Sequence, residues 1–560
     1  MKRNIFQKIK KMLPLCAVAV LMGNVSCTGD FEKINTNPNG LRPDQIGVAA
    51  RFNQPITSIY LNYQNRHYEY QLMQNLNADL YSGYMGVPTA FGGNYCNSTY
   101  AMNEGWNEMP FTAGESYVMK PISDILKSTE EPDYVSIAKI IRVEAMHRIV
   151  DIYGPIPYTE AMQGGASVPY DDVETLYKTF IQELTESVDA LTEFVDAGSA
   201  DAARISDFDI VCGADHKQWI RFANTLRLRL AMRISMVAPE LAKTTAEAAV
   251  NHKYGVLVAG NNNVEVRSAS VQNPLSEINY GYSDIRIGAS LVSILKGYDD
   301  PRLSVYVTPV GWFNDGEDIK DVNGKPTNKI GEYVGIRQGT WIDDKANYQM
   351  YSTINMIKSS KNTDLTNPGQ ITNALPWMKV AEAYFLRAEG ALRGWNMGGS
   401  AQELYEQGIK VSFDEHGLSA DAYNKYIANE TGVAANFEDP HNPANNISGI
   451  DKCTVKWDSS VSNEEKLHKI INQKWIAMFP EGQEAWSEFR RTGYPKLFPV
   501  ANNYSSTVNG GIENGEFVKR LRFPRNDKNA NKAEVEKAVS LLSGPDNEAT
   551  RLWWDTGRNF

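Results

Sequence analysis

The chain has 560 residues, of which 42% are hydrophobic and 22% are charged. This composition is typical of a globular protein and excludes a disordered, collagen-like or disulfide-stapled chain. The formal charge of −11 disfavours nucleic-acid binding, because phosphate neutralisation needs clustered Lys and Arg. The length leaves open about three or four domains or a single large helical one.

Residues 1–26 have the pattern of a secretory signal peptide. Residues 1–11 hold five basic side chains and no acidic one, and the apolar run 12–22 and small residues follow. The run is about half as long as the ~20 residues that span a bilayer as a helix, so cleavage is expected. Cleavage would remove five positive charges from −11 and leave −16.

Cys27 is the predicted lipid attachment site. Val25-Ser26-Cys27 resembles the end of a bacterial lipobox, in which the cysteine becomes the acylated first residue of the mature chain. Asn24 departs from the motif, which usually has a Leu-like residue there. Secretion with an unlipidated Cys27 is the alternative. Residues 27–45, polar and containing prolines, are interpreted as a tether.

The three other cysteines of the mature chain are widely spaced, at Cys96, Cys212 and Cys453. Since no CxxC motif or Cys/His cluster appears, the sequence predicts no zinc site. A chain of this length does not need disulfides to fold. We interpret the three as buried core residues.

Residues 46–560 are predicted to form one mainly α domain with little β structure. Apolar residues recur at helical spacing in 135–150 and in 173–194, where Asp172 is the expected N-cap. A third helix runs through Trp219 and Leu230. Its interleaved arginines are expected to be solvated or paired with acids of neighbouring helices: Arg221, Arg227, Arg229 and Arg233.

A loop-rich insertion is expected at about 253–370, where Gly, Asn, Ser and Tyr are frequent. Short β-like runs occur in it at 264–266 and 305–307.

Helices return after the insertion. Residues 377–393 and 401–416 look like a helical hairpin of the tetratricopeptide type, in which paired helices stack into a superhelix. A last pair is predicted at 463–479 and 482–492, with Trp475 and Trp486 in the core. Arg490 and Arg491 are expected to end the second helix and to brace the scaffold.

Several separated stretches resemble the SusD/RagB family of outer-membrane nutrient-capture lipoproteins, in order and spacing over nearly the whole mature chain. The resemblance implies a mainly helical, tetratricopeptide-like scaffold at the cell surface, without enzymatic activity. It also implies a SusC-like TonB-dependent transporter as partner, over which the lipoprotein acts as a lid. The stretches are CTGDFEKINTNPNG (27–40), RIVDIYGPIPYTEA (148–161), WIRFANTLRLRLAMRIS (219–235), LKGYDDPRL (295–303) and INQKWIAMFPEGQEAWSEFRRTGYPKL (471–497).

Two aromatic loop regions, 81–106 and 311–351, are the predicted ligand surface. Aromatic faces suit the apolar CH faces of sugar rings, and Asn, Asp and Arg stand beside them here. The alternative is that these rings pack the loop cores. The candidate residues are Tyr81, Tyr84, Phe91, Tyr95, Trp106, Trp312 and Trp341.

The expected ligand is an oligosaccharide, with an oligopeptide as the main rival. A glycoside hydrolase is the enzymatic alternative, since such enzymes need only two suitably placed carboxylates. No Walker loop, GxGxxG, HExxH or GxSxG motif occurs. The acidic run 314–318 lacks the spacing of an EF-hand, so it is interpreted as a solvated turn rather than a calcium site. We therefore predict no cofactor and no metal.

The lipid-anchor hypothesis predicts that Cys27→Ala releases the protein from membranes, because the apolar run alone is too short to hold it there. Phase partitioning in detergent measures this directly. An unchanged detergent-phase fraction would rule out lipidation at Cys27.

Overall fold

The computed structural model describes residues 46–61, 66–165, 167–267, 273–311, 329, 331–341, 349–356, 374–505 and 511–560. Residues 48–560 form one compact unit, and residues 1–47 are assigned to another. Cys27, Trp312 and the acidic run 314–318 lie outside the described residues.

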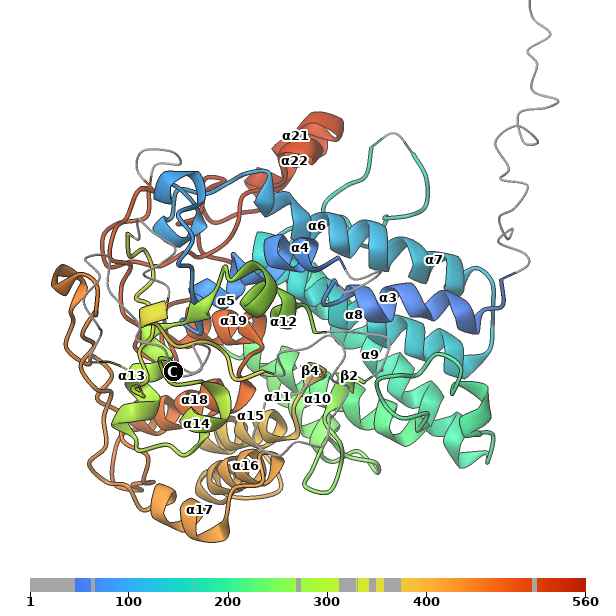
Figure 1. Ribbon diagram of the computed structural model, residues 1–560. Helices are drawn as coiled ribbons and strands as arrows, with labels where there is room; N and C mark the ends of the chain where they lie inside the picture. Colours follow the sequence, from blue (N-terminus) through green and yellow to red (C-terminus); the bar gives the residue numbers. More distant parts are fainter. Residues whose placement is uncertain are drawn as a thin grey trace, which may run out of the picture. The chain divides into compact units, whose positions relative to one another are not determined.

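Four pairs of helices form the scaffold of the larger unit (Figure 1). The two helices of each of the first three pairs pack closely on one another, and α9 packs on α10, α10 on α15, and α15 on α18. The predicted mainly helical, tetratricopeptide-like fold is confirmed. The pairs are α8 (Pro132–Tyr153) with α9 (Val173–Asp196), α10 (His216–Arg233) with α11 (Pro239–Val250), α15 (Val380–Leu392) with α16 (Ala401–Glu415), and α18 (Asn463–Met478) with α19 (Gly482–Thr492).

The remaining α-helices are shorter. None of the helices within the described ranges has the length and apolar character needed to cross a membrane. The shorter ones are α3 (Asn53–Ser58), α4 (His67–Tyr70), α5 (Ala78–Tyr81), α6 (Met109–Thr112), α7 (Lys120–Leu126), α12 (Pro274–Ser276), α13 (Ala289–Gly297), α14 (Arg302–Tyr306), α17 (Ala420–Ile427), α21 (Arg525–Ala530) and α22 (Lys532–Ser540).

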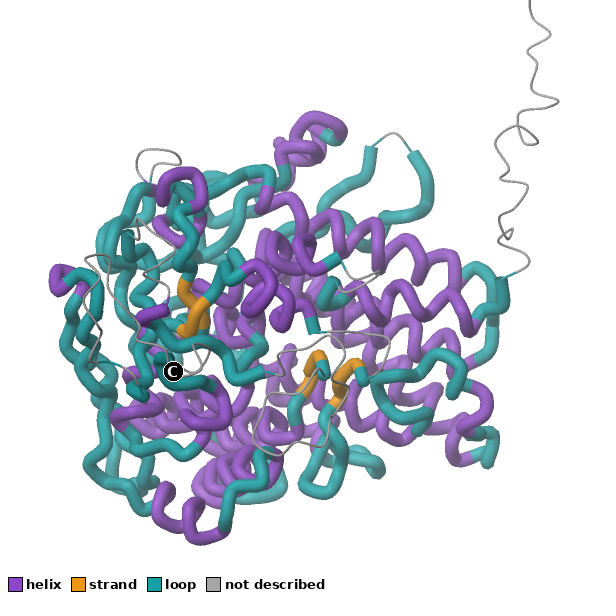
Figure 2. The backbone as a smooth tube through the Cα atoms, in the orientation of Figure 1, coloured by secondary structure: helices purple, strands orange, loops and turns teal. Residues whose placement is uncertain are grey.

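The strands make two small antiparallel sheets, which Figure 2 shows among loops and helices. In the first, Met85 pairs with Ile287, and in the second, Val264 pairs with Met378 beside a register shift. The strands are β1 (Met85–Gly86) with β3 (Arg286–Ile287), and β2 (Val264–Val266) with β4 (Leu375–Met378).

Side-chain caps explain why several helices begin where the sequence indicates. The Asp172 carboxylate accepts a hydrogen bond from the Thr175 amide at the start of α9, as expected. Ser400 with Glu403, and Ser462 with Glu465, form reciprocal capping boxes before α16 and α18. The last predicted pair therefore agrees with α18 and α19 to within one residue.

The secondary structure of the predicted insertion at about 253–370 differs in part from what the sequence indicates. The β-like run 264–266 is strand β2, but 305–307 was predicted wrongly, because Val305 and Tyr306 end helix α14 and only Val307 makes an isolated bridge to Ile354. A short apolar run does not distinguish helix from strand. Here the buried Asp300 carboxylate accepts from the Arg302 amide and starts the helix.

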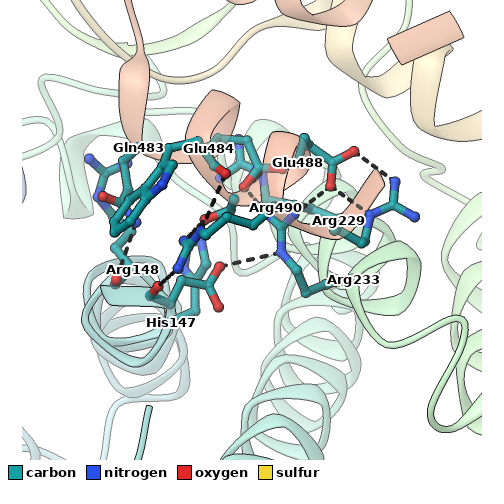
Figure 3. Close-up of polar contacts among 12 residues, drawn as sticks. His147, Arg148, Arg229, Arg233, Gln483, Glu484, Glu488 and Arg490 are labelled. Atoms are coloured by element: carbon teal, nitrogen blue, oxygen red, sulfur yellow. Dashed lines mark hydrogen bonds and ion pairs between the residues drawn. The ribbon is translucent and has the colours of Figure 1, made fainter. Parts of the chain in front are cut away.

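Five scaffold helices meet at a buried cluster of charged side chains, which we call the ionic core (Figure 3 shows part of it). None of its members is more than 4% exposed. They are Glu144 and Asp151 of α8, Arg229 and Arg233 of α10, Glu382 and Glu389 of α15, Lys474 of α18, and Glu484, Glu488 and Arg491 of α19.

Two of these arginines are each joined to a carboxylate by two hydrogen bonds. Arg229 donates to both oxygens of Glu382 at 2.8 and 2.7 Å, and Arg491 donates to both oxygens of Glu389 at 2.7 Å. Arg233 of α10 forms ion pairs with both Glu484 and Glu488, which lie in α19. The arginines predicted to pair with neighbouring acids are confirmed for Arg229 and Arg233, and the bracing role of Arg491 is confirmed as well.

The pKa values of the carboxylates in the ionic core are shifted in different directions. Burial works to raise the pKa of Glu484, but Arg233, Lys474 and Arg229 lower it to about 2. Burial raises the pKa of Glu144 to about 8, although Arg229 Nη1 lies 3.5 Å from its Oε2. Among the described residues, neither oxygen of Glu144 accepts a hydrogen bond.

The expected core residues are buried. Trp475 and Trp486 are 2% and 0% exposed, and the indole nitrogens donate to the carbonyls of Ser82 and Val518. Cys96, Cys212 and Cys453 are buried and unbridged. These predictions are confirmed.

Arg233→Met is expected to lower the free energy of unfolding by about 3–5 kcal/mol, because it leaves Glu484 and Glu488 short of a buried partner. Lys425→Met is the matched control, since its partner Asp299 and Lys425 itself are 76% and 78% exposed. The control should cost less than about 1 kcal/mol. Urea unfolding compares the two, and equal losses would contradict a structural role for the ionic core.

Candidate ligand-binding site

Three aromatic side chains from distant segments form a cluster at the surface, which we call the aromatic triad. Tyr95 stacks on Tyr504 with ring centroids 4.8 Å apart and an interplanar angle of 25°. Trp341 meets both rings edge-on, at 6.5 and 6.3 Å. Tyr95 is 52% and Trp341 38% exposed. The triad therefore offers aromatic surface to solvent.

Hydrogen bonds between the three segments hold the triad together. The Tyr504 amide donates to the Thr99 carbonyl at 2.8 Å, and the Ala501 amide donates to the Gln338 carbonyl at 2.8 Å. The Asn502 side chain donates to the carbonyl of Gly339 at 2.9 Å.

Gly339 is required where the segment that carries Trp341 meets the chain near Val500. Its φ is +75°, and a Cβ there would lie 2.2 Å from Val500 Cγ2. Any larger residue would therefore push the two segments apart.

The loop that carries Tyr95 is fixed by a buried amide. Asn97 is 0% exposed, and its Nδ2 donates to the Leu76 carbonyl, to Asn77 Oδ1 and to Asn107 Oδ1 at 2.7 to 2.9 Å. Its Oδ1 accepts from the Asn103 amide at 2.9 Å. These bonds are all made within the protein, so a ligand need not supply the ordering of the loop.

Phe91 and Trp106 form a second, separate pair. Their rings meet edge-to-face at 5.3 Å and 84°, and both are half-buried against the main core. The Trp106 amide donates to Asn103 Oδ1, so the pair shares the loop of Tyr95. Both residues remain candidates beside the triad, with less ring surface offered to solvent.

Tyr81 and Tyr84 are corrected from ligand candidates to core residues. They are 3% and 0% exposed. The Tyr84 hydroxyl donates to the Trp475 carbonyl, and the Tyr81 ring packs against Trp486 at 5.2 Å. The composition of a Tyr- and Gly-rich stretch does not distinguish a segment that faces solvent from one that is buried, as α5 is against α19. Trp312 lies outside the described residues.

Tyr504 was not among the ligand-binding residues predicted from the sequence. Its neighbours Asn502, Asn503 and Ser505 give the same mixture of tyrosine and small polar residues that indicated the other two loops. That local signal was present, but Tyr504 and its contact Tyr95 are more than 400 positions apart in the chain, so the sequence did not show that the two rings meet.

A cavity of about 240 Å³ beside α13 is an alternative site. Its lining is charged and polar, with Lys296, Lys329, Glu332 and Glu438 around it. Lys329 Nζ lies 3.4 Å from Glu332 and 3.8 Å from Glu438. Both acidic side chains thus lie beside Lys329, and the cavity has little aromatic surface, so the aromatic triad is the stronger candidate for ligand binding.

The helical pairs and the loop-borne aromatic triad define a scaffold protein that presents a preformed surface. The chain belongs to the SusD-like family, described as Susd and RagB outer membrane lipoprotein, whose model matches residues 31–555. The resemblance seen in the sequence is thereby confirmed.

Solved structures agree with this assignment. A chitin-binding SusD homolog from Flavobacterium johnsoniae is 41% identical, with a TM-score of 0.82 over 91% of this chain and 99% of the other. A SusD homolog from Bacteroides vulgatus is 33% identical, with a TM-score of 0.81 over 91% and 98%. A search of curated proteins gave no match.

Trp341→Ala and Tyr95→Ala are expected to change the free energy of unfolding by less than about 1 kcal/mol, because the two side chains are 38% and 52% exposed and lie outside the core. Tyr84→Ala should cost about 3–5 kcal/mol, as for other large buried aromatics. Chemical denaturation of the three variants measures the difference. A Trp341→Ala loss as large as that of Tyr84→Ala would return Trp341 to the core.

Proposed function

We propose that this protein captures an oligosaccharide at the cell surface and delivers it to a SusC-like TonB-dependent transporter. The single observation that carries the proposal is the exposed aromatic triad, held in place by hydrogen bonds among three segments. The description of the 41% identical relative as chitin-binding supports a glycan, and makes N-acetylglucosamine oligomers the first probe.

The chemistry of the triad suits a sugar chain. One face of a pyranose ring carries axial C–H bonds and stacks on an aromatic ring, while its hydroxyls at the rim need polar partners. Trp341 and Tyr95 supply the rings, and the hydroxyl of the half-exposed Tyr95 supplies a polar group. Each stacking contact adds ~0.5–1.5 kcal/mol beyond burial. After the ordering cost of a flexible oligomer, capture should be roughly micromolar to millimolar.

The anchor and partner complete the proposal. Lipidation at Cys27 and the tether 27–45 would hold the scaffold at the outer membrane, as the family description supports. Weak capture would then allow the ligand to pass to the transporter. Binding without cleavage is proposed, because the family is one of lipoproteins that include a chitin-binding homologue.

Calorimetry with N-acetylglucosamine oligomers tests capture. The wild-type protein should give a saturable response, and Trp341→Ala should weaken affinity about tenfold or more, because it removes both stacking and buried apolar area. Tyr68→Ala is the matched control, since Tyr68 is 53% exposed against 52% for Tyr95 and lies outside the triad. Its affinity should be unchanged.

Other outcomes would decide against the proposal. If a panel of glycans gives no saturable heat while mixed oligopeptides do, the ligand class is wrong. If chromatography after incubation shows shortened oligomers, the protein is a hydrolase. If Trp341→Ala and Tyr68→Ala bind as well as the wild type, the site lies elsewhere.

A further inference from the structure

A second cluster of chemically active side chains lies in the scaffold, apart from the triad. Single ligand atoms of Asp451, Cys453 and His468 all lie within 4.8 Å of one another. Asp451 and Cys453 belong to the segment that precedes α18, and His468 lies in α18. Asp451 is fully buried, Cys453 is 9% exposed and the His468 side chain 15%.

The cluster has the ligand types of a tetrahedral zinc site, and its ligand atoms lie within about 1 Å of the spacing that zinc requires. Zinc takes Cys sulfur at ~2.3 Å and His nitrogen or carboxylate oxygen at ~2.0–2.2 Å, which places neighbouring ligand atoms ~3.3–3.8 Å apart. Asp451 Oδ2 and His468 Nε2 are 3.0 Å apart here. A thiolate and a carboxylate would together neutralise the two charges of the ion.

The buried amide of Asn472 lies next to the cluster and has an oxygen atom that no described residue binds. Asn472 is 1% exposed, and its Oδ1 has no hydrogen-bond partner among the described residues. Its Nδ2 donates to Asp451 Oδ2 at 3.2 Å and to the Tyr298 hydroxyl at 3.0 Å. Turning the amide by half a turn would bring Oδ1 beside the carboxylate, an arrangement that is repulsive unless a cation lies between the two oxygens.

The surroundings hold these side chains in place as the outer shell of a metal site does. The amides of Cys453 and Lys496 donate to Asp451 at 2.9 and 2.8 Å. The His468 ring stacks on Tyr494 with centroids 3.9 Å apart.

The ammonium of Lys469 is bound beside the cluster rather than within it. Lys469 Nζ donates to the carbonyl and hydroxyl of Thr454, both at 2.7 Å. It is thereby engaged outside the group of ligand atoms.

We propose that Asp451, Cys453, His468 and Asn472 form a structural zinc site that ties the segment before α18 to that helix. The ion would displace the Cys453 thiol proton to solvent and replace the His468–Asp451 hydrogen bond, with the imidazole proton on Nδ1. The pattern Asp-x-Cys followed by His and Asn in a helix lacks a CxxC motif, which is why spacing alone does not indicate it.

The test uses the full-length lipoprotein, purified in detergent, stripped with a chelator and titrated with Co²⁺ as a spectroscopic probe. We expect one equivalent to bind, with a thiolate-to-cobalt charge-transfer band that Zn²⁺ abolishes. Cys453→Ser should lose the band and weaken metal affinity more than ~100-fold, beyond the usual effect of an outer-shell change. Cys212→Ser, which alters another buried unbridged cysteine, should keep both.

His468→Gln separates metal binding from hydrogen bonding, because glutamine retains an N–H donor. It should weaken Co²⁺ affinity, and zinc should raise the melting temperature of the wild type but not of this variant. Absence of a charge-transfer band and of any zinc-dependent shift in the wild type would show a hydrogen-bonded cluster only and overturn the proposal. A band that persists in Cys453→Ser would overturn it too. Glycan affinity reports separately on the triad.

Discussion

The paired charges of the ionic core constrain how the scaffold helices meet. Taking a charged side chain out of water costs several kcal/mol, so each buried arginine must find its carboxylate. An apolar helix face tolerates small shifts, whereas a two-bond pair such as Arg491–Glu389 fits only one relative position of α19 and α15. We infer that the ionic core sets the register of five helices and contributes more to a single packing than to net stability.

The same pairs give the scaffold a defined response to pH. The pKa of Glu484 is lowered to about 2, so its contribution is present above its ordinary pKa and is lost as pH falls toward 2. The pKa of Glu144 is raised to about 8, so the folded state holds a proton that the unfolded chain releases near pH 4.5. The free energy of unfolding therefore falls as pH rises from about 5 to 8, because Glu144 ionises more readily in the unfolded chain than in the folded one. The ionic core favours a range in which Glu484 is charged and Glu144 neutral.

Local features of the sequence predicted the scaffold well, and long-range ones did not. Caps such as Asp172 and Ser462 act within one helical turn, so helix starts could be read from the sequence. Glu382 and Glu484, which pair with Arg229 and Arg233, lie more than 150 positions away from them, and spacing could not identify these partners. Likewise, the same aromatic and polar composition selected both the exposed Tyr95 and the buried Tyr84, because composition does not show which side chains of a loop are buried.

Exposed aromatic rings cannot be fixed by burial, because burial would remove the surface that they offer to a ligand. They must be held by hydrogen bonds of the segments that carry them. The structure supplies this with the Asn97 amide under the Tyr95 loop and with backbone bonds from 501 and 504 to the other two segments. Such bonds are directional, so they fix a loop without covering its rings. The helices hold the fold through buried charge pairs, and the triad can therefore change with little cost to the scaffold. A common scaffold with replaceable loop residues follows from this separation, and it accounts for a fold that persists at 33% identity.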